Sequence, residues 1–388
     1  MRLPLLLPTA PAAAPASHPS ALRHMTLDEL RRFSVARNFP KPTTLKQAID
    51  RIGFVQADPI RAPARAQDLI LRQRVKNYLA GDLERRYESL EIEEDFFVNY
   101  GYVADWLHGL MHPRSNSRVP ADDVGRPWPA AQMKRANLIL EFVRAHGSVH
   151  PREVDEHFAH GKVTNYWGGS SNATTHLMDA MHYQGFLRVV KREKGIRIYS
   201  AREQDREAVD QNDINKRMDD LVDVLVKIYG PLPAASLSFY VRRLRFAVPQ
   251  WKDEVQATLK RAKERLQHTH FHVEWYWSTD EEVHGHSLQD TVRFLAPFDP
   301  LVHDRWRFER LWGWTYRFEA YTPVQKRKLG YYAMPVLWRD QVIGWVNLSV
   351  NNKDLESDFG YVKKRPLDGT FKRELSLELD RVRAFLKL

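Results

Sequence analysis

The sequence predicts an α+β protein with tandem winged-helix motifs followed by a small C-terminal β-barrel. Residues 134–205 contain three helical stretches and then two β-branched strands joined by a basic turn at Lys194–Gly195. A similar order recurs over residues 213–290. Residues 291–388 are rich in predicted strands and end in an amphipathic helix.

The N-terminal region is expected to divide into a tail and a helical domain. Residues 1–24 are rich in Pro and Ala, so we expect either a disordered tail or an over-extended start with Met25 as the natural initiator. Thr26 and Glu29 form a capping-box pattern that opens a first helix. Residues 25–115 then follow the order helix, helix, short strand and helix, which predicts a helix-turn-helix-like domain.

The composition favours a polyanionic partner. The chain has 388 residues, with 59 Lys and Arg against 49 Asp and Glu, and a net charge of +10. Such a charge favours nucleic acid or an acidic membrane surface. The chain has no cysteine, which excludes disulfides, thiolate zinc sites and a cysteine nucleophile. No apolar run approaches the ~20 residues that span a bilayer.

The stretch FVQADPI holds the candidate catalytic pair. Strand alternation places Gln56 and Asp58 on one face, where a carboxylate and an amide can hold a water molecule between them. The carboxylate would polarise the water or stabilise a cationic sugar, as glycosidic hydrolysis requires. A structural alternative exists, because Asp58-Pro59 is also an ordinary N-cap or turn dipeptide.

Four segments carry a resemblance to a known family: FVQADPI, ARAQDLIL, FLAPFDPLVHDR and YRFEAYTPVQKRKLGYYAMPVLWRDQVIGWVNL. From about Met25 to Lys353 the chain resembles the AlkZ/YcaQ family of bacterial crosslink-repair DNA glycosylases. The resemblance implies tandem winged helices and a β-barrel around DNA, with a Gln-x-Gln or Gln-x-Asp catalytic signature. Gln56 and Asp58 match the Gln-x-Asp form. The chain departs from the family at Asn99, where members carry a histidine in a Trp-Ala-His-like stretch.

The resemblance implies a monofunctional DNA glycosylase that hydrolyses the N-glycosidic bond of alkylated or crosslinked purines in DNA repair. It implies no cofactor and no metal, double-stranded DNA as the partner, and Asn99 and Tyr100 as possible lesion-pocket residues. We further expect a monomer in the cytoplasm, associated with the nucleoid and not with a membrane. The alternative is a non-catalytic winged-helix DNA-binding protein or regulator, which the departure at Asn99 favours.

Basic residues near the pair, on the first hairpin and in the last third are candidate DNA contacts. Each of them also fits an ordinary solvated basic surface. We expect the arginines near Asp58 to keep its carboxylate ionised, since nearby positive charge favours the charged form. The candidate DNA contacts are Arg61, Arg65, Arg72, Lys191, Arg192, Lys194, Arg197, Lys326 and Arg327.

A histidine-rich segment is a weaker candidate for a zinc site. Strand alternation would put His270, His272 and Glu274 on one face, with His284 and His286 following. A surface strand over a tryptophan core explains the same residues, so we predict no metal.

Overall fold

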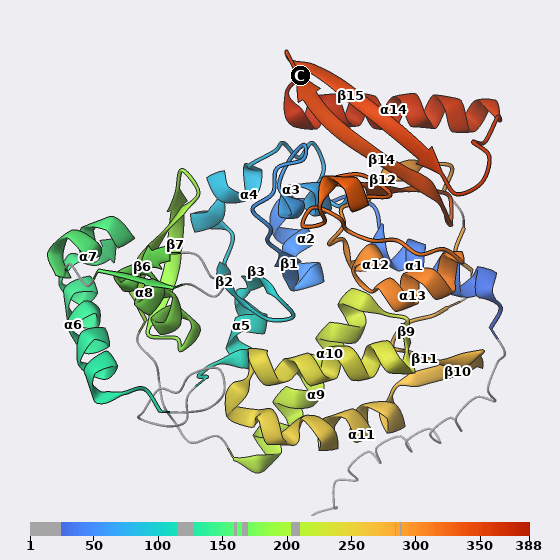
Figure 1. Ribbon diagram of the computed structural model, residues 1–388. Helices are drawn as coiled ribbons and strands as arrows, with labels where there is room; N and C mark the ends of the chain where they lie inside the picture. Colours follow the sequence, from blue (N-terminus) through green and yellow to red (C-terminus); the bar gives the residue numbers. More distant parts are fainter. Residues whose placement is uncertain are drawn as a thin grey trace, which may run out of the picture.

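The computed structural model describes residues 25–114, 127–158, 161–164, 170–202, 210–283, 285–287 and 289–388. The predicted tail, residues 1–24, lies outside the described residues. The chain folds as a mixed α/β protein whose strands form separate antiparallel sheets (Figure 1). No helix in the described part of the chain is both long and apolar enough to cross a bilayer.

The N-terminal unit is built around the sheet β1-β3-β2, in the middle of Figure 1. The predicted capping box is confirmed, because Glu29 N donates to Thr26 Oγ1 at 3.3 Å and Thr26 N donates to Glu29 Oε2 at 2.8 Å. Strand β1 ends at Gln56, so Asp58 lies just beyond the strand and not within it. The elements are α1 (Leu27–Asn38), α2 (Leu45–Ile52), β1 (Phe54–Gln56), α3 (Ala66–Leu71), α4 (Asp82–Arg85), η1 (Tyr87–Ser89), β2 (Ile92–Phe96), β3 (Tyr100–Ala104) and α5 (Asp105–Met111).

The second unit lies to the left in Figure 1 and contains the three predicted helices and the predicted hairpin. Its main sheet has the order β4-β8-β7, and β5 pairs with β6. The elements are α6 (Ala130–His146), β4 (Ser148–Val149), α7 (Pro151–Phe158), β5 (Lys162–Thr164), β6 (Ser170–Asn172), α8 (Ala173–Tyr183), β7 (Leu187–Glu193) and β8 (Ile196–Ala201).

The third unit repeats this order at the bottom of Figure 1, with the sheet β10-β11-β9. The N-terminal, second and third units each contain a three-stranded sheet. In each of these sheets the strand that comes last in the chain lies between the other two, so the same topology is repeated. The elements are α9 (Gln211–Tyr229), β9 (Leu232–Pro233), α10 (Ala234–Ala247), η2 (Pro249–Glu254), α11 (Val255–Arg265), β10 (Gln267–Phe271) and β11 (Val273–Trp277).

The C-terminal unit contains a four-stranded sheet in the order β12-β13-β14-β15, with helix α14 beside it (Figure 1). Among the described residues no pairing joins β12 to β15, so a closed barrel stays a prediction. The elements are β12 (Val292–Phe294), α12 (Pro300–His303), α13 (Arg305–Trp312), η3 (Val324–Lys326), β13 (Met334–Trp338), β14 (Gln341–Asn351), β15 (Asp354–Tyr361) and α14 (Gly369–Leu386).

Strand β1 is packed on both faces, which fixes the position of its last residue. Phe54 belongs to a buried cluster shared with α9, α10 and α11, whereas Val55 belongs to a cluster shared with the second and C-terminal units. Successive strand side chains point to opposite faces, so each face of β1 is anchored in a different core. Gln56 therefore stands where these units meet.

Candidate active site

Gln56 is held at the end of β1 by a chain of hydrogen bonds. Its Oε1 accepts a hydrogen bond from Asn99 Nδ2 at 3.0 Å, and Asn99 lies in the turn between β2 and β3. Asn99 Oδ1 in turn accepts from Arg243 Nη2, on α10, at 2.9 Å. Arg243 Nε donates to the Val98 carbonyl at 2.8 Å, which fixes the guanidinium.

His303, at the end of α12, completes this group as a neutral ring. Its Nε2 lies 3.4 Å from Asn99 Nδ2, and its Nδ1 lies 2.8 Å from the Tyr240 hydroxyl. Burial, followed by the charges of nearby arginines, lowers the pKa of His303 to about 3. Because the Asn99 amino group can only donate, Nε2 of the neutral ring accepts, and Nδ1 carries the hydrogen and donates to Tyr240.

These partners determine which way the Gln56 amide faces. A guanidinium has no acceptor, so the Asn99 oxygen faces Arg243 and the Asn99 amino group faces Gln56. Gln56 therefore presents its oxygen to Asn99. Its Nε2 donates to no other residue in the described ranges and is left as a donor toward a substrate or a water molecule.

Asp58 is buried two residues beyond the end of β1. Its Oδ1 accepts from the backbone N–H of Ile60 at 2.9 Å, and its own N–H donates to Gln67 Oε1 at 3.3 Å. The Oδ1 bond closes a turn, so the structural alternative for Asp58-Pro59 is also met. Oδ2 accepts no hydrogen bond within the described part of the chain, which leaves it available for chemistry.

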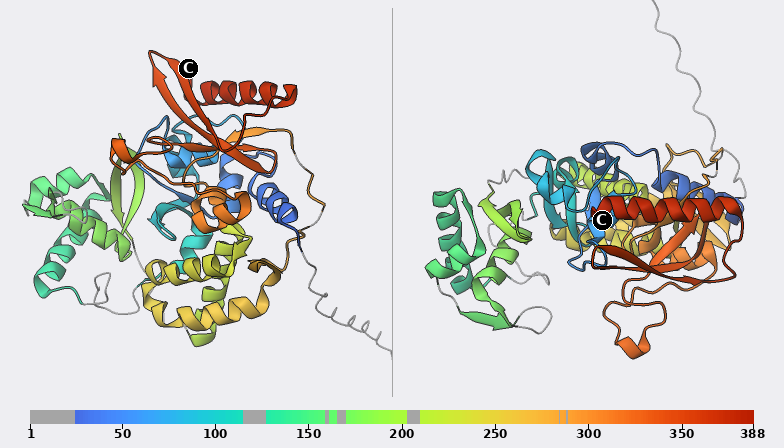
Figure 2. Two further views of the ribbon diagram at one scale, coloured as in Figure 1. Left: turned by 45° about the vertical axis from the view of Figure 1, so that its right-hand side comes forward. Right: turned by 90° about the horizontal axis from the view of Figure 1, so that it is seen from above.

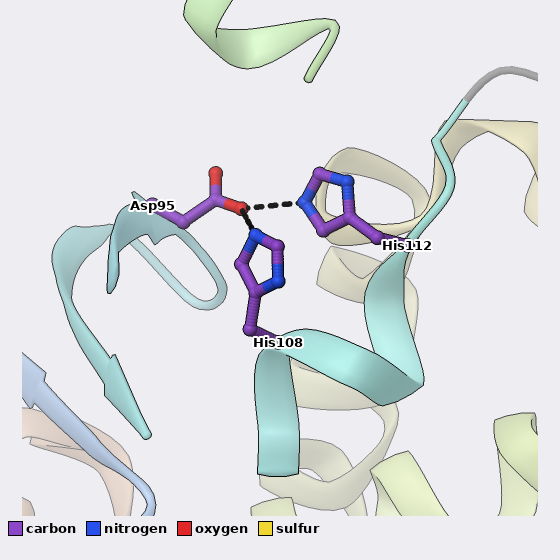
Figure 3. A group of neighbouring side chains, drawn as sticks. All are labelled: Asp95, His108 and His112. Carbon is purple, nitrogen blue, oxygen red and sulfur yellow. Dashed lines mark hydrogen bonds and ion pairs between the residues drawn. The ribbon is translucent and has the colours of Figure 1, made fainter. Parts of the chain in front are cut away.

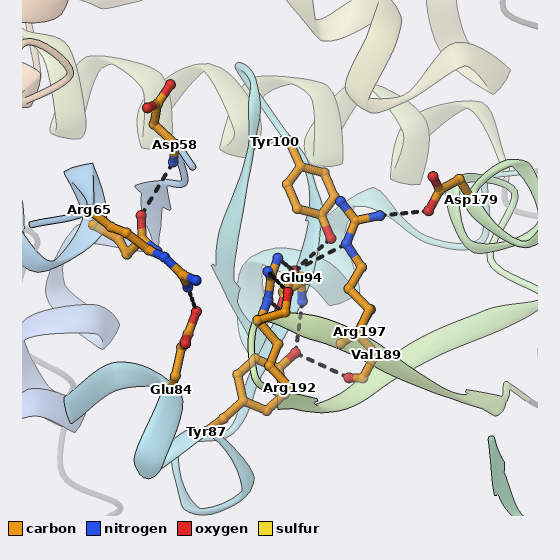
Figure 4. Close-up of polar contacts among 12 residues, drawn as sticks. Asp58, Arg65, Glu84, Tyr87, Glu94, Tyr100, Asp179, Val189, Arg192 and Arg197 are labelled. Atoms are coloured by element: carbon orange, nitrogen blue, oxygen red, sulfur yellow. Dashed lines mark hydrogen bonds and ion pairs between the residues drawn. The ribbon is translucent and has the colours of Figure 1, made fainter. Parts of the chain in front are cut away.

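The pKa of Asp58 is raised, in contrast to the expectation that arginines keep it ionised. Burial is the main cause, and the hydrogen bond from Ile60 opposes it. Figure 4 shows the Asp58 carboxylate directed away from Arg65, whose guanidinium pairs with Glu84. A carboxylate whose pKa is raised is a better proton acceptor, which suits a general base.

For the glycosidic hydrolysis that the resemblance implies, we expect Asn99→Asp to reduce the single-turnover rate about fivefold to tenfold, the worth of one hydrogen bond of about 1–1.5 kcal/mol. The substitution keeps the acceptor for Arg243 but removes the donor to Gln56 Oε1, so the amide of Gln56 can turn over. The readout is the double-mutant cycle with Gln56→Ala. If Asn99 acts by orienting Gln56, it adds little loss in the Gln56→Ala background. Fully additive losses would show that Asn99 acts independently.

Tyr100, the other possible lesion-pocket residue, contacts Glu94 and Arg197 and not Gln56. Its hydroxyl donates to Glu94 Oε2 at 2.7 Å, and the Arg197 guanidinium lies 4.3 Å from its ring centroid (Figure 4). Asn99 and Tyr100 are adjacent in sequence, yet Asn99 is the one bonded to Gln56. The hydroxyl of Tyr100 is thus engaged by Glu94, and its role in a lesion pocket stays a prediction.

The β7–β8 hairpin is docked against β2. Arg192 donates to both oxygens of Glu94 at 2.6 and 2.5 Å, and Arg197 Nε lies 3.7 Å from the same carboxylate. The turn also touches the N-terminal unit, since a Cβ added at Gly195 would lie 2.9 Å from the Arg65 guanidinium. Arg192 and Arg197 thus have internal partners in place of the predicted phosphates.

The remaining candidate DNA contacts separate into exposed and internal residues. Arg72 donates to Glu378 at 2.5 Å and its side chain is 5% exposed, so its predicted role as a phosphate contact is replaced by an internal one that joins α3 to α14. Arg65 pairs with Glu84. Of the rest, Arg61, Lys194 and Lys326 are exposed, and Lys191 and Arg327 are partly exposed.

A buried group of two histidines and a carboxylate has the composition of a metal site but not its geometry (Figure 3). His108 and His112 stack with ring centroids 3.9 Å apart and an interplanar angle of 12°. Both Nε2 atoms approach Asp95 Oδ2, at 3.6 and 2.8 Å. Lone pairs of nearly parallel stacked rings do not converge on one point ~2.1 Å from each nitrogen, as zinc requires. Arg114 also donates to Asp95, at 2.7 Å, so we interpret the group as structural.

The histidine-rich segment does not lie on one strand face as predicted. His272 has a φ of 57° and forms the turn between β10 and β11. His270 and Glu274 therefore stand on paired strands, where His270 Nδ1 lies 2.9 Å from Glu274 Oε1. His284 lies outside the described residues.

Comparison with known proteins identifies the family of the chain. A family model described as DNA glycosylase AlkZ-like matches residues 49–385. The chain belongs to the AlkZ-like DNA glycosylase family. Its fold is similar to that of Streptomyces sahachiroi DNA glycosylase AlkZ, with a TM-score of 0.60, 12% sequence identity, and coverage of 94% of this chain and 97% of that chain. The predicted family is confirmed, and with it the class of activity: a DNA glycosylase, a hydrolase of N-glycosyl bonds that acts on DNA.

Three residues of the group around Gln56 were missed by sequence reasoning: Tyr240, Arg243 and His303. His303 lies in FLAPFDPLVHDR, one of the segments that carried the family resemblance, so a signal for it was present. Tyr240 and Arg243 are spaced by three residues on α10 and thus share one helix face. Nothing local distinguishes them from other residues of an amphipathic helix.

Proposed function

We propose that this AlkZ-like glycosylase releases ring-alkylated purines, including crosslinked ones, from double-stranded DNA, with Gln56 and Asp58 as catalytic residues. The observation that carries this proposal is the buried Asp58 carboxylate, one oxygen of which accepts no hydrogen bond from the described residues, two positions after a Gln56 amide of fixed orientation. If Asp58 served only to close a turn, its Oδ1 hydrogen bond would be sufficient. The hydrogen bonds through which Asn99 and Arg243 fix the Gln56 amide would then have no role.

The chemistry that this geometry supports is water attack on a cationic sugar. An alkylated purine carries positive charge, so the pair of electrons from the broken C1′–N bond neutralises the departing base. Asp58 stabilises the oxocarbenium-like sugar and takes the proton of the water whose oxygen bonds to C1′. The Gln56 amide donates to that water and orients it. The products are a free base and an abasic site, with no lyase step.

We interpret the three units with sheets β1-β3-β2, β4-β8-β7 and β10-β11-β9 as winged-helix motifs that grip a duplex. The proposed phosphate contacts are Arg61, Lys191, Lys194, Lys326 and Arg327. Phosphate contacts position the protein on a duplex but do not read its sequence. We therefore propose a monomer that binds duplex DNA with little sequence preference.

Lys191→Gln/Lys194→Gln should reduce the slope of log affinity against log salt by about 1 to 2. Lys194 is exposed in the hairpin turn, and the Lys191 side chain is 41% exposed and pairs with Glu193, so a duplex can reach both without breaking the Glu94 contacts. The measurement is fluorescence anisotropy with an undamaged duplex across salt concentrations. Lys372→Gln/Lys387→Gln, at the two ends of α14, removes the same charge elsewhere and serves as the control. Equal salt slopes in the two double variants would show that the hairpin does not contact the DNA backbone.

The proposed activity is tested with a duplex that carries a single N7-alkylguanine and with a crosslinked duplex. Alkaline cleavage after incubation reveals abasic sites, and a denaturing gel reveals strands that have separated. Abasic sites in either substrate support the glycosylase. Tight binding without abasic sites in both would favour a DNA-binding protein that has lost the chemistry.

A further inference from the structure

Tyr332 is a buried tyrosine whose hydroxyl has no hydrogen-bond partner within the described part of the chain. Figure 2 shows the segment that carries η3 standing out from the body of the molecule. Tyr332 lies where the chain has returned from this projection, two residues before β13, and is 2% exposed. A buried hydroxyl that makes no hydrogen bond costs free energy, so such a group calls for an explanation.

The packing of the Tyr332 ring does not explain the hydroxyl. The ring packs edge-on against Phe318, with centroids 5.3 Å apart and an interplanar angle of 90°. A phenylalanine would make the same contact without the unpaired oxygen. Tyr316, which is also buried, uses its hydroxyl in the ordinary way and donates to the Ala333 carbonyl at 2.8 Å. The Tyr332 hydroxyl therefore indicates a role beyond packing.

Tyr332 lies in the region of Asp58. Tyr332 and Val55 belong to one buried cluster, and Ala57 and Ile60, on either side of Asp58, pack against that cluster. Burial and then the charge of Asp58 raise the pKa of Tyr332 well above its ordinary value, which agrees with this placement. The unpaired hydroxyl and the Asp58 oxygen that accepts no hydrogen bond from the described residues are thus neighbours.

The two groups are complementary as donor and acceptor. Because burial and the charge of Asp58 favour the neutral form of Tyr332, its hydroxyl keeps its hydrogen and can donate. The other groups that act in the same direction are Tyr316, Tyr321 and Tyr331. The Tyr332 hydroxyl and the Asp58 carboxylate form no direct hydrogen bond. A water molecule that accepts from Tyr332 and donates to Asp58 Oδ2 would satisfy both groups.

We propose that Tyr332 is a positioning residue for base release: its hydroxyl donates to a water molecule that in turn donates to Asp58 Oδ2, and this contact holds the carboxylate in its charged form. A hydrogen bond to a carboxylate favours the charged form, so it opposes the effect of burial. Oδ2 has a second lone pair, which remains for the proton of the attacking water. The contact itself needs no DNA, but its role in base release rests on the proposed function.

The first test is the pH profile of single-turnover base release by the full chain with Tyr332→Phe. Loss of the donor raises the pKa of Asp58 further, so the acid limb should move to higher pH. The rate on that limb should fall about threefold to tenfold, the worth of one hydrogen bond, while the plateau rate stays near that of the parent. Tyr316→Phe is the matched control, because it removes a neighbouring hydroxyl and should leave the acid limb in place. An unmoved acid limb in Tyr332→Phe would overturn the role in base release.

The second test needs no activity and uses urea titration at several pH values. Relative to the parent, Tyr332→Phe should lose stability as the pH rises through the pKa of Asp58, because the lost contact served the charged carboxylate. This loss should vanish in the Asp58→Asn background, and the deficit of Tyr316→Phe should be the same at every pH. A stability difference of Tyr332→Phe that does not change with pH would overturn the contact. A pH-dependent loss, where the parent releases no base, would uphold the contact and reject the glycosylase mechanism.

Discussion

Asp58→Asn is expected to lower the single-turnover rate of base release by about 100-fold or more, as for a lost acid/base group. The substitution keeps the size of the side chain and the acceptor for the Ile60 N–H, but removes the charge that stabilises the cationic sugar and takes the proton of water. Affinity for a lesion duplex should stay near that of the parent. The measurement is rapid-quench kinetics with enzyme in excess.

The pH dependence of the parent gives an independent check on Asp58. Burial raises its pKa, so the rate should fall on the acid side at a pH above the ordinary pKa of a free aspartate, and the Asn variant should lack this limb. A raised folded pKa favours folding at low pH, and this contribution is lost as the pH rises through it. At neutral pH the buried charge therefore costs stability, and Asp58→Asn should be as stable as the parent or more so. A variant that unfolds, while its folded fraction keeps the parent rate, would show that Asp58 serves the turn alone.

Glu94→Gln is expected to reduce the free energy of unfolding by about 3–5 kcal/mol, the usual cost of breaking a buried ion pair from one side. The Glu94 carboxylate is fully buried and joins Arg192 and Arg197 of the hairpin to Tyr100 of β3 (Figure 4). An amide leaves Arg192 without a charge partner in a buried position, whereas Arg197 keeps its ion pair with Asp179. Urea titration followed by tryptophan fluorescence measures the change.

The control is Glu156→Gln, in an ion pair with Arg152 whose side chains are 62% and 80% exposed. Such a pair is expected to contribute less than about 1 kcal/mol. Although burial alone would raise the pKa of Glu94, its arginine partners lower it overall. A lowered folded pKa gives stability that is lost as the pH falls through it, so the deficit of Glu94→Gln should shrink in acid. Equal, small effects of the two substitutions would mean that the hairpin does not depend on Glu94.

Features whose partners are near in sequence could be predicted from the sequence. The capping box joins Thr26 to Glu29, three residues away, and the Gln-x-Asp pair joins positions two apart. The helices and hairpin of the second unit follow from local periodicity in the same way. These signals place Gln56 and Asp58 at the end of a strand before any tertiary contact is known.

The rest of the site depends on contacts between distant segments. Asn99 meets Arg243 across 144 positions and His303 across 204, and Arg72 meets Glu378 across 306. Basic residues in a sequence cannot be sorted into phosphate contacts and internal ion pairs, because the sorting depends on burial. The pKa of Asp58 was mispredicted for that reason: the arginines are near in sequence, but the carboxylate points away from Arg65.

The central claim is that this protein hydrolyses an N-glycosidic bond in DNA with Gln56 and Asp58. The most direct test is mass spectrometry of free base released from a duplex with a single N7-alkylguanine, with abasic sites counted in the same sample. We expect equal amounts of free alkylguanine and abasic site from the parent, both lost in Asp58→Asn at equal DNA occupancy. Equal release by the parent and the variant, or no free base from a fully bound duplex, would contradict the claim.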